Sequence, residues 1–248
     1  MPWVAGQERA FEELGDWYHR IDLRDGRVTP GDRNQALVFD FYRPHLPSDL
    51  TGLEVLDLGA NAGGLSVEFA ARGAQVLAIE TRDEYLAQAE YVVGVLGLQD
   101  QITLQQADFY DCFDLGQFDI VCFLGLVYHL RHPQLALDML GRLCRGTLLA
   151  SSQTIPSDGL VMQNRATRIE GRSLGAIVGW EPTEELFREM IAHAGFRNPR
   201  LVSRKPHVGE SPGNICGNRS YFIADAGEPR MLPFLDRGYV GDPRFRWQ

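Results

Sequence analysis

The strongest constraint on the fold is the segment EVLDLGANAGG at residues 54–64, where an apolar run ends in a glycine-rich turn. Glycine tolerates left-handed backbone angles and close approach by other groups, so a turn of this kind joins a strand directly to a helix. A strand and helix joined in this way are typical of the first unit of a parallel α/β sheet. The segment therefore predicts a strand at residues 54–58 and a helix at residues 64–72.

The following sequence repeats this alternation of short apolar runs and longer helical patterns. Further strands are predicted at residues 75–79, 102–105, 118–124, 147–151, 200–203 and 220–224. Further helices are predicted at residues 83–97, 133–144 and 182–194, the last with Thr183 as its cap and Gly195 as its stop. We therefore expect an α/β fold, Rossmann-like and doubly wound, with a mostly parallel seven-stranded sheet and an antiparallel last strand.

The chain divides into three expected regions. Residues 1–52 form an N-terminal lid with a helix at 32–46, and residues 53–225 form the ligand-binding domain. An irregular insertion rich in Gly, Ser and Arg interrupts that domain at residues 153–180. Residues 226–248 are expected to form a C-terminal tail, either packed or partly disordered.

Composition favours a globular protein of a reducing compartment. No apolar run approaches the ~20 residues that a membrane span needs, and no signal-peptide pattern opens the chain. The four cysteines form no CxxC pair, so we interpret them as reduced thiols of a cytoplasmic protein without a membrane partner. A net charge of −9 argues against nucleic acid as the substrate, although a local basic patch could outweigh it.

Acidic residues follow three successive predicted strands, where open α/β sheets bind their ligands. Asp57 ends the first strand, and Asn61 replaces the second glycine of the dinucleotide motif GxGxxG. A carboxylate there repels a pyrophosphate but suits a sulfonium-bearing amino acid. Glu80 follows the second strand, where an acid can accept hydrogen bonds from both ribose hydroxyls. Asp108 follows the third, and with Phe109 it suits an adenine ring.

The ordered series LDLGANAGG, IE at residues 79–80 and ADF at residues 107–109 resembles the class I methyltransferases that depend on S-adenosylmethionine (SAM). The resemblance covers roughly residues 53–224 and implies that SAM is the cofactor, bound by the domain at residues 53–225. A strand-end Asp or a turn Gly recurs in any doubly wound sheet, so the order of the series carries the argument. The implied cofactor-binding residues are Asp57, Gly59, Asn61, Gly63, Glu80, Asp108, Phe109 and Gly125.

The run FLGLVYHLRHP at residues 123–133 follows the fourth predicted strand. Together with residues 17–32 and 180–196, it is similar to the family of the tRNA wobble-uridine carboxymethyl transferase and its small-molecule relatives. The chain has a shorter N-terminal extension than that enzyme and lacks its tryptophan- and lysine-rich stretch, so plain SAM is the expected cofactor. In this arrangement Gly125 lies beside the sulfonium, and Tyr128 and His129 project toward the transferred methyl.

Tyr128 and His129 are the catalytic candidates. An unperturbed imidazole titrates near neutral pH, so His129 is the predicted general base; the alternative is a histidine that only shapes the pocket. His129 and His132 have an HxxH spacing, but no nearby pair of carboxylates completes a metal site. We therefore expect no metal.

The lead-in and the insertion supply further substrate-binding candidates. Trp17, Tyr18 and His19 predict either an aromatic lid over the substrate or a hydrophobic anchor for the N-terminus. Arg165 and Arg168 would share one helix face, which either binds an anion or is simply solvated. Arg219 precedes the last strand and either reaches the rim of the pocket or belongs to a turn.

The expected function is methyl transfer from SAM to an oxygen or nitrogen atom of a small molecule. Modification of tRNA or another RNA is the alternative, favoured by the resemblance and by the arginines of the insertion. A SAM-binding module without catalysis, or an NAD oxidoreductase, is the alternative from another class. The pattern indicates neither the acceptor atom nor an oligomeric state.

Overall fold

The computed structural model describes residues 8–112, 114–164, 179–207 and 217–229. Its helices are α1 (Glu8–Glu13), α2 (Gln35–Tyr42), α3 (Gly64–Ala70), α4 (Asp83–Leu96), α5 (Pro133–Leu143) and α6 (Glu184–His193), with 3₁₀ turns η1 (Arg43–His45), η2 (Phe109–Asp111) and η3 (Val127–His129). The strands of the main sheet are β3 (Glu54–Leu58), β4 (Gln75–Glu80), β5 (Ile102–Gln106), β6 (Phe118–Leu124), β7 (Cys144–Thr154), β10 (Arg197–His207) and β11 (Gly217–Asp225). Short strands β1 (His19–Arg20), β2 (Arg33–Asn34), β8 (Met162–Asn164) and β9 (Trp180–Pro182) lie outside it.

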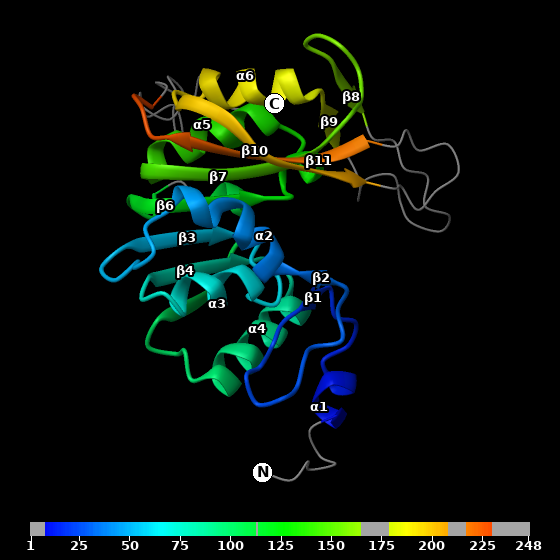
Figure 1. Cartoon of the computed structure of the whole chain (residues 1–248), viewed down its shortest axis with the longest axis vertical. Helices are drawn as coiled ribbons and strands as arrows, with labels where there is room; N and C mark the ends of the chain where they lie inside the picture. Colours follow the sequence, from blue (N-terminus) through cyan, green and yellow to red (C-terminus); the bar gives the residue numbers. More distant parts are fainter. Residues whose placement is uncertain (1–7, 113, 165–178, 208–216, 230–248) are drawn as a thin grey trace, which may run out of the picture.

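The main sheet has the order β10-β11-β7-β6-β3-β4-β5, as Figure 1 shows. Strands β3 to β7 run parallel, and β11 runs antiparallel to both of its neighbours, β7 and β10. This confirms the predicted Rossmann-like sheet with an antiparallel last strand. The chain starts the sheet at β3 and builds outward on both sides of it, so the carboxyl ends of β3 and β6 flank the topological switch point where such folds bind ligands.

Helices cover both faces of the sheet because side chains alternate along each strand. In β3, Val55 faces the apolar core that α2, α3 and α4 close, whereas Leu56 faces the core that α5 and α6 close. Both side chains are fully buried. Two cores on one sheet hold the strand ends in fixed positions, which a binding site at that edge requires.

Two sequence predictions need correction. The predicted helix at residues 32–46 begins only at Gln35, because Asn34 is extended and its side chain caps the helix by accepting from the amide of Ala36 at 3.0 Å. The insertion at 153–180 is also more regular than expected: β7 continues to Thr154, and β8 pairs antiparallel with β9.

The end signals of α6 are confirmed. Thr183 caps it by accepting from the amide of Leu186 at 3.2 Å, and Gly195 follows it with φ +98°. None of the helices in the described ranges is long and apolar enough to cross a membrane.

Candidate functional site

Three left-handed residues shape the loop between β3 and α3. Gly59, Asn61 and Gly63 have φ angles of +71°, +52° and +76°. Asn61 is the non-glycine among them, and short amide side chains tolerate this region better than most others because they can bond locally. Its Oδ1 atom accepts from the amide of Ala62 at 2.8 Å. The predicted glycine-rich turn is therefore confirmed, and its residues 60–64 lie buried at the carboxyl end of β3.

The Glu80 carboxylate at the end of β4 is tied to this loop. It accepts from the amides of Asn61 (2.8 Å), Thr81 (2.8 Å) and Arg82 (3.0 Å), and the residue is 8% exposed. A carboxylate has about four acceptor positions, so these bonds orient it and leave room for a hydroxyl donor. Glu80, the residue predicted to bind the ribose, is thus held in a fixed orientation beside the loop.

Asp57 lies buried at the end of β3, with 4% of its surface exposed. Its Oδ2 atom accepts from the Ser66 hydroxyl at 2.7 Å. Burial raises the pKa of Asp57 to about 6, the Ser66 bond lowers it, and the charge of Glu80 raises it further. Within the described ranges no basic side chain pairs with Asp57. The carboxylate is therefore poised to receive a cation.

Asp57→Asn should stabilise the ligand-free protein at neutral pH but not in acid. Because the folded pKa of about 6 lies above the ordinary 3.8, ionisation of Asp57 opposes folding progressively as pH rises from 4 through 6. A shift of two units corresponds to roughly 3 kcal/mol at pH 7 and above, an upper bound for the gain because the Ser66 bond also changes.

Urea unfolding of both proteins at pH 4, 5.5 and 7.5 measures this gain. Asp49→Asn is the control, because Asp49 is exposed, its pKa is lowered by its bonds to Thr51, and its removal should give no such gain. A stability difference between Asp57→Asn and the parent that stays constant with pH would contradict the prediction.

The acid that follows β5, the third predicted strand, is more exposed than Asp57 and Glu80. Asp108 is exposed, and its Oδ1 atom accepts from the amide of Tyr110 at 2.9 Å, which caps η2. Phe109 is only 7% exposed and packs with its ring centroid 5.4 Å from that of Phe123. Asp108 is thus available to a ligand, whereas Phe109 belongs mainly to the core; their roles at an adenine stay predictions.

At the end of β6, Gly125 leaves space for two side chains from distant elements. A Cβ atom there would lie 3.2 Å from the Tyr128 hydroxyl and 3.7 Å from Nη1 of Arg219. The Arg219 guanidinium donates to the Tyr128 hydroxyl through Nη2, and its centre lies 5.5 Å from the Tyr128 ring. Arg219 lies within β11 and pairs with Gln153 of β7, so the long strands bring it to the rim of residues around Gly125 rather than to a turn. Its place at the edge of a pocket stays a prediction.

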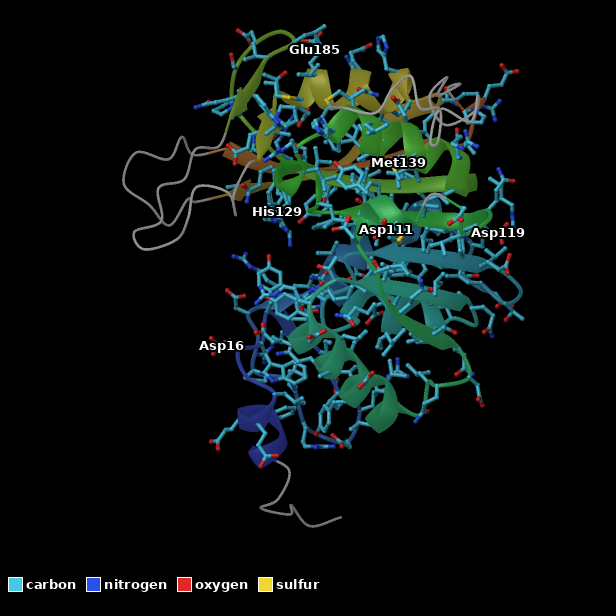
Figure 2. All side chains as sticks on the ribbon, turned by 180° about the vertical axis from the view of Figure 1, so that it is seen from behind. Asp16, Asp111, Asp119, His129, Met139 and Glu185 are labelled. Carbon is cyan, nitrogen blue, oxygen red and sulfur yellow. The ribbon has the colours of Figure 1, made fainter. Side chains whose placement is uncertain are left out.

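His129 is exposed on η3, with its ring centroid 4.3 Å from that of Tyr128. Figure 2 shows His129 and Asp16 at one end of the sheet and Asp119 at the opposite end. His129 thus lies at the carboxyl edge of the parallel strands, the same edge as the loop between β3 and α3 (residues 59–63, the Gly-rich loop). Among the described residues, no three His, Cys, Asp or Glu side chains gather as metal ligands would.

The lead-in folds back over the Gly-rich loop through His19. This side chain is 6% exposed, and its Nδ1 atom accepts from the amide of Gly64 at 3.4 Å. Burial lowers the pKa of His19 to about 3, so the imidazole is neutral at physiological pH. Tyr18 is 37% exposed, and its hydroxyl acts on the pKa of Arg219, which places it beside the same rim.

Trp17, another substrate candidate, does not join this group. Trp17 donates from Nε1 to the carbonyl of Phe11 at 3.2 Å, and both rings pack edge-on against Tyr91 of α4. That position supports the anchoring alternative for Trp17. Arg165 and Arg168 lie outside the described residues.

Ser66 is a site residue that sequence reasoning missed. It lies in the first turn of α3 and is fully buried, although serine is mostly a surface residue. Its position two residues after Gly64, on the helix that follows Asp57, is the signal that could have identified it. A hydroxyl there can point back to the strand end, as it does here.

Comparison with known proteins gives consistent matches. A family model described as "Methyltransferase domain" matches residues 7–200. The ubiquinone biosynthesis O-methyltransferase of Azoarcus sp. (strain BH72) is 30% identical over 194 residues, which cover 78% of either chain. The tRNA U34 carboxymethyltransferase of Proteus mirabilis (strain HI4320) is 27% identical over 82% of this chain, which spans only 58% of that enzyme.

Among solved structures, the N-terminal domain of EvdMO1, crystallised with SAH and D-fucose, superposes with a TM-score of 0.69 at 23% identity. The match covers 90% of this chain and 97% of that domain. At this identity the likeness concerns the fold, and it extends over nearly the whole of both chains.

Proposed function

The chain belongs to the class I SAM-dependent methyltransferases, and on that premise we propose that it methylates an oxygen or nitrogen atom of a small-molecule substrate. Membership of this family is inconsistent with an NAD oxidoreductase. The burial of side chains at the rim beside Gly125 carries the small-molecule proposal: Tyr128 is 6% exposed, and Nε of Arg219 is buried. A rim of buried side chains suits a small ligand better than a folded RNA, and a net charge of −9 acts in the same direction.

The carboxyl edge fits the cofactor in charge and in shape. SAM is cationic at its sulfonium and its ammonium group, and Asp57 is a buried carboxylate with no cation beside it in the described ranges. The left-handed loop lies next to Glu80, which keeps acceptor capacity for a hydroxyl group. We propose as cofactor-binding residues the set Asp57, Gly59, Asn61, Gly63, Glu80, Asp108, Phe109 and Gly125.

When bound, SAM supplies a methyl group already activated on a sulfonium. The chain's own residues therefore have to align the acceptor and remove its proton. We propose that His129 takes that proton, because its imidazole is exposed at the rim and stacks beside Tyr128. Tyr128 is held by the hydrogen bond from Arg219 and positions the acceptor.

His129→Ala should lower kcat with little change in the affinity for SAM. Because the methyl group of SAM is already activated, proton removal contributes less to the rate. We therefore expect kcat to fall about tenfold to a hundredfold, at or below the usual contribution of a general base. The pH–rate profile should lose the limb that a general base contributes. The exposed His193→Ala is the control; full activity of His129→Ala would leave His129 only a role in shaping the pocket.

Calorimetric titration with SAM, S-adenosylhomocysteine and NAD tests the cofactor. Binding of the first two without the third is expected, and binding of NAD alone would end the proposal. Incubation with methyl-labelled SAM and two acceptor pools, a low-molecular-mass metabolite fraction and total tRNA, then tests the substrate class. Label in the metabolite fraction is expected.

The tRNA alternative is favoured by one specific observation, the match to the tRNA U34 carboxymethyltransferase over 82% of this chain. Its test is the binding of tRNA at increasing salt. An RNA enzyme should bind tightly at low salt and lose affinity steeply as salt rises, because phosphate contacts release counterions. Label in the tRNA pool together with such binding would replace the small-molecule proposal.

A further inference from the structure

Arg219 is a charged side chain enclosed by neutral groups. Burial acts to lower the pKa of Arg219, but the hydroxyls of Tyr128, Tyr18 and Tyr221 outweigh it and raise the pKa above its ordinary value. The guanidinium therefore stays charged. Within the described ranges no carboxylate forms an ion pair with it. Tyrosine hydroxyls accept its hydrogen bonds without neutralising its charge.

One hydrogen-bond donor of the Arg219 guanidinium has no acceptor among the described residues. The Nε atom of Arg219 is buried and has no hydrogen-bond partner in the described part of the chain. Buried cations are normally paired, and a buried donor without an acceptor is uncommon in folded proteins. An anionic ligand would supply the acceptor that this donor lacks.

The charge of Arg219 is also separated from the acids of the same edge. Asp57 and Glu80 end the strands β3 and β4, whereas Arg219 lies over Gly125 after β6, on the far side of β3. The carboxyl edge of the sheet is therefore acidic at β3 and β4, which suits a cation, and positively charged at β6, where Arg219 lies. A guanidinium offers a planar pair of donors that matches a carboxylate or a phosphate.

We propose that Arg219 binds an anionic group, a carboxylate or a phosphate, of the acceptor substrate. This inference rests on the proposed function, because it assigns the rim beside Gly125 to the acceptor. Tyr128 and Tyr18 then flank the anion with hydroxyl groups, and the substrate is a small molecule that is negatively charged near the atom that receives the methyl. The net charge of −9 makes such a receptor specific, since an anion meets little other attraction.

Binding of small probes to the protein saturated with S-adenosylhomocysteine tests this inference without any turnover. Benzoate and phenyl phosphate carry the two anionic groups, and benzyl alcohol is their neutral counterpart. We expect at least one of the two anions to bind tenfold or more tightly than benzyl alcohol by calorimetry, and its identity to distinguish a carboxylate from a phosphate. Equal affinities of all three probes would overturn the inference.

Arg219→Gln should abolish the preference for the anion, and Arg219→Lys should keep part of it. Arg204→Gln is the matched control, because it removes the same charge from the neighbouring strand β10, where Arg204 is exposed and pairs with Glu184. The unfolding temperature of Arg219→Gln should not fall, because the Arg219 cation has no counter-ion that the substitution would leave unpaired. If that temperature does fall, the anion preference is tested with Arg219→Lys instead.

Two results would contradict the role of Arg219. An anion preference that survives in both variants would place the receptor elsewhere. A loss of S-adenosylhomocysteine affinity equal to the loss for the anion would assign Arg219 to the cofactor instead. Neither result bears on methyl transfer, which the label experiment measures separately.

Discussion

Replacing Glu80 by alanine is expected to weaken SAM binding by about tenfold to a hundredfold and to loosen the loop between β3 and α3. The Glu80 carboxylate has two roles, one in the fold and one in the proposed cofactor complex. In the folded protein it accepts from the amides of Asn61, Thr81 and Arg82, and in the proposed complex it also accepts from a ribose hydroxyl. A hydrogen bond to a charged group contributes about 1.5–3 kcal/mol, so losing the bond to a ribose hydroxyl corresponds to about a tenfold to hundredfold loss of affinity.

The loop adds a second effect. Without the carboxylate, the buried amide of Asn61 loses its acceptor, and an unsatisfied buried donor costs about 1–3 kcal/mol. We therefore expect a lower free energy of unfolding even without ligand. Glu80→Gln should lie between the parent and Glu80→Ala, because its amide oxygen can still accept from one of the three donors.

Calorimetry with SAM and urea unfolding without ligand measure the two effects separately. Glu84→Ala is the control: Glu84 lies four residues further on, exposed on α4, and its ion pair with Arg82 is at the surface. Surface pairs contribute little, so neither measurement should change in that variant. Unchanged SAM affinity in Glu80→Ala would remove Glu80 from the site.

The sequence predicts the sheet and the positions of the acids at its strand ends, because both depend on local patterns. The strand at residues 54–58 and the turn after it lie in one continuous segment. Glu80 follows directly from the end of the next strand. Parallel strands place their carboxyl ends at one edge whatever the detailed packing, so Asp57, Glu80 and Asp108 could be placed there from spacing alone.

The rest of the site depends on contacts between segments that are far apart in the chain. His19 and Gly64 are 45 residues apart, and Tyr128 and Arg219 are 91 residues apart. No periodicity links such pairs, so the lid, anchor and turn alternatives for these residues stayed open. Two of the three lead-in candidates separate in the structure, with Trp17 packing against α4 and His19 lying over the loop.

The length of β7 shows the same limit. Apolar character predicts the strand only over residues 147–151, whereas it runs from Cys144 to Thr154. Its last residues, Gln153 and Thr154, are polar but buried, because β11 pairs with them from the other side. That pairing delivers Arg219 to the rim, and it cannot be seen in the sequence of β7 by itself.

Gly31→Ala is expected to detach the lead-in from the site, with the largest loss of stability among these variants. Gly31 is buried, and a Cβ atom there would lie 2.3 Å from the carbonyl oxygen of His19 and 2.6 Å from the carbonyl carbon of Tyr18. Both contacts are with backbone, which cannot rotate away as a side chain could. Overpacking a tight site costs typically about 1–3 kcal/mol and occasionally more, and we expect the upper end here.

The functional consequence follows from where His19 and Tyr18 point. If the added methyl group pushes their backbone outward, His19 loses its contact with the amide of Gly64, and Tyr18 moves away from Arg219. SAM affinity should therefore fall together with the free energy of unfolding. A variant that lost stability but kept full affinity for SAM would show that the lead-in takes no part in the site.

Gly94→Ala gives the matched comparison, because it makes the same chemical change with the opposite expected sign. Gly94 lies within α4, and the nearest atom to a Cβ there would be 3.9 Å away. Alanine is favoured over glycine in a helix by about 1 kcal/mol, so this variant should be slightly more stable and bind SAM normally. Opposite shifts in the urea midpoints of Gly31→Ala and Gly94→Ala would show that the close approach at Gly31, rather than any loss of glycine, holds the lead-in over the Gly-rich loop.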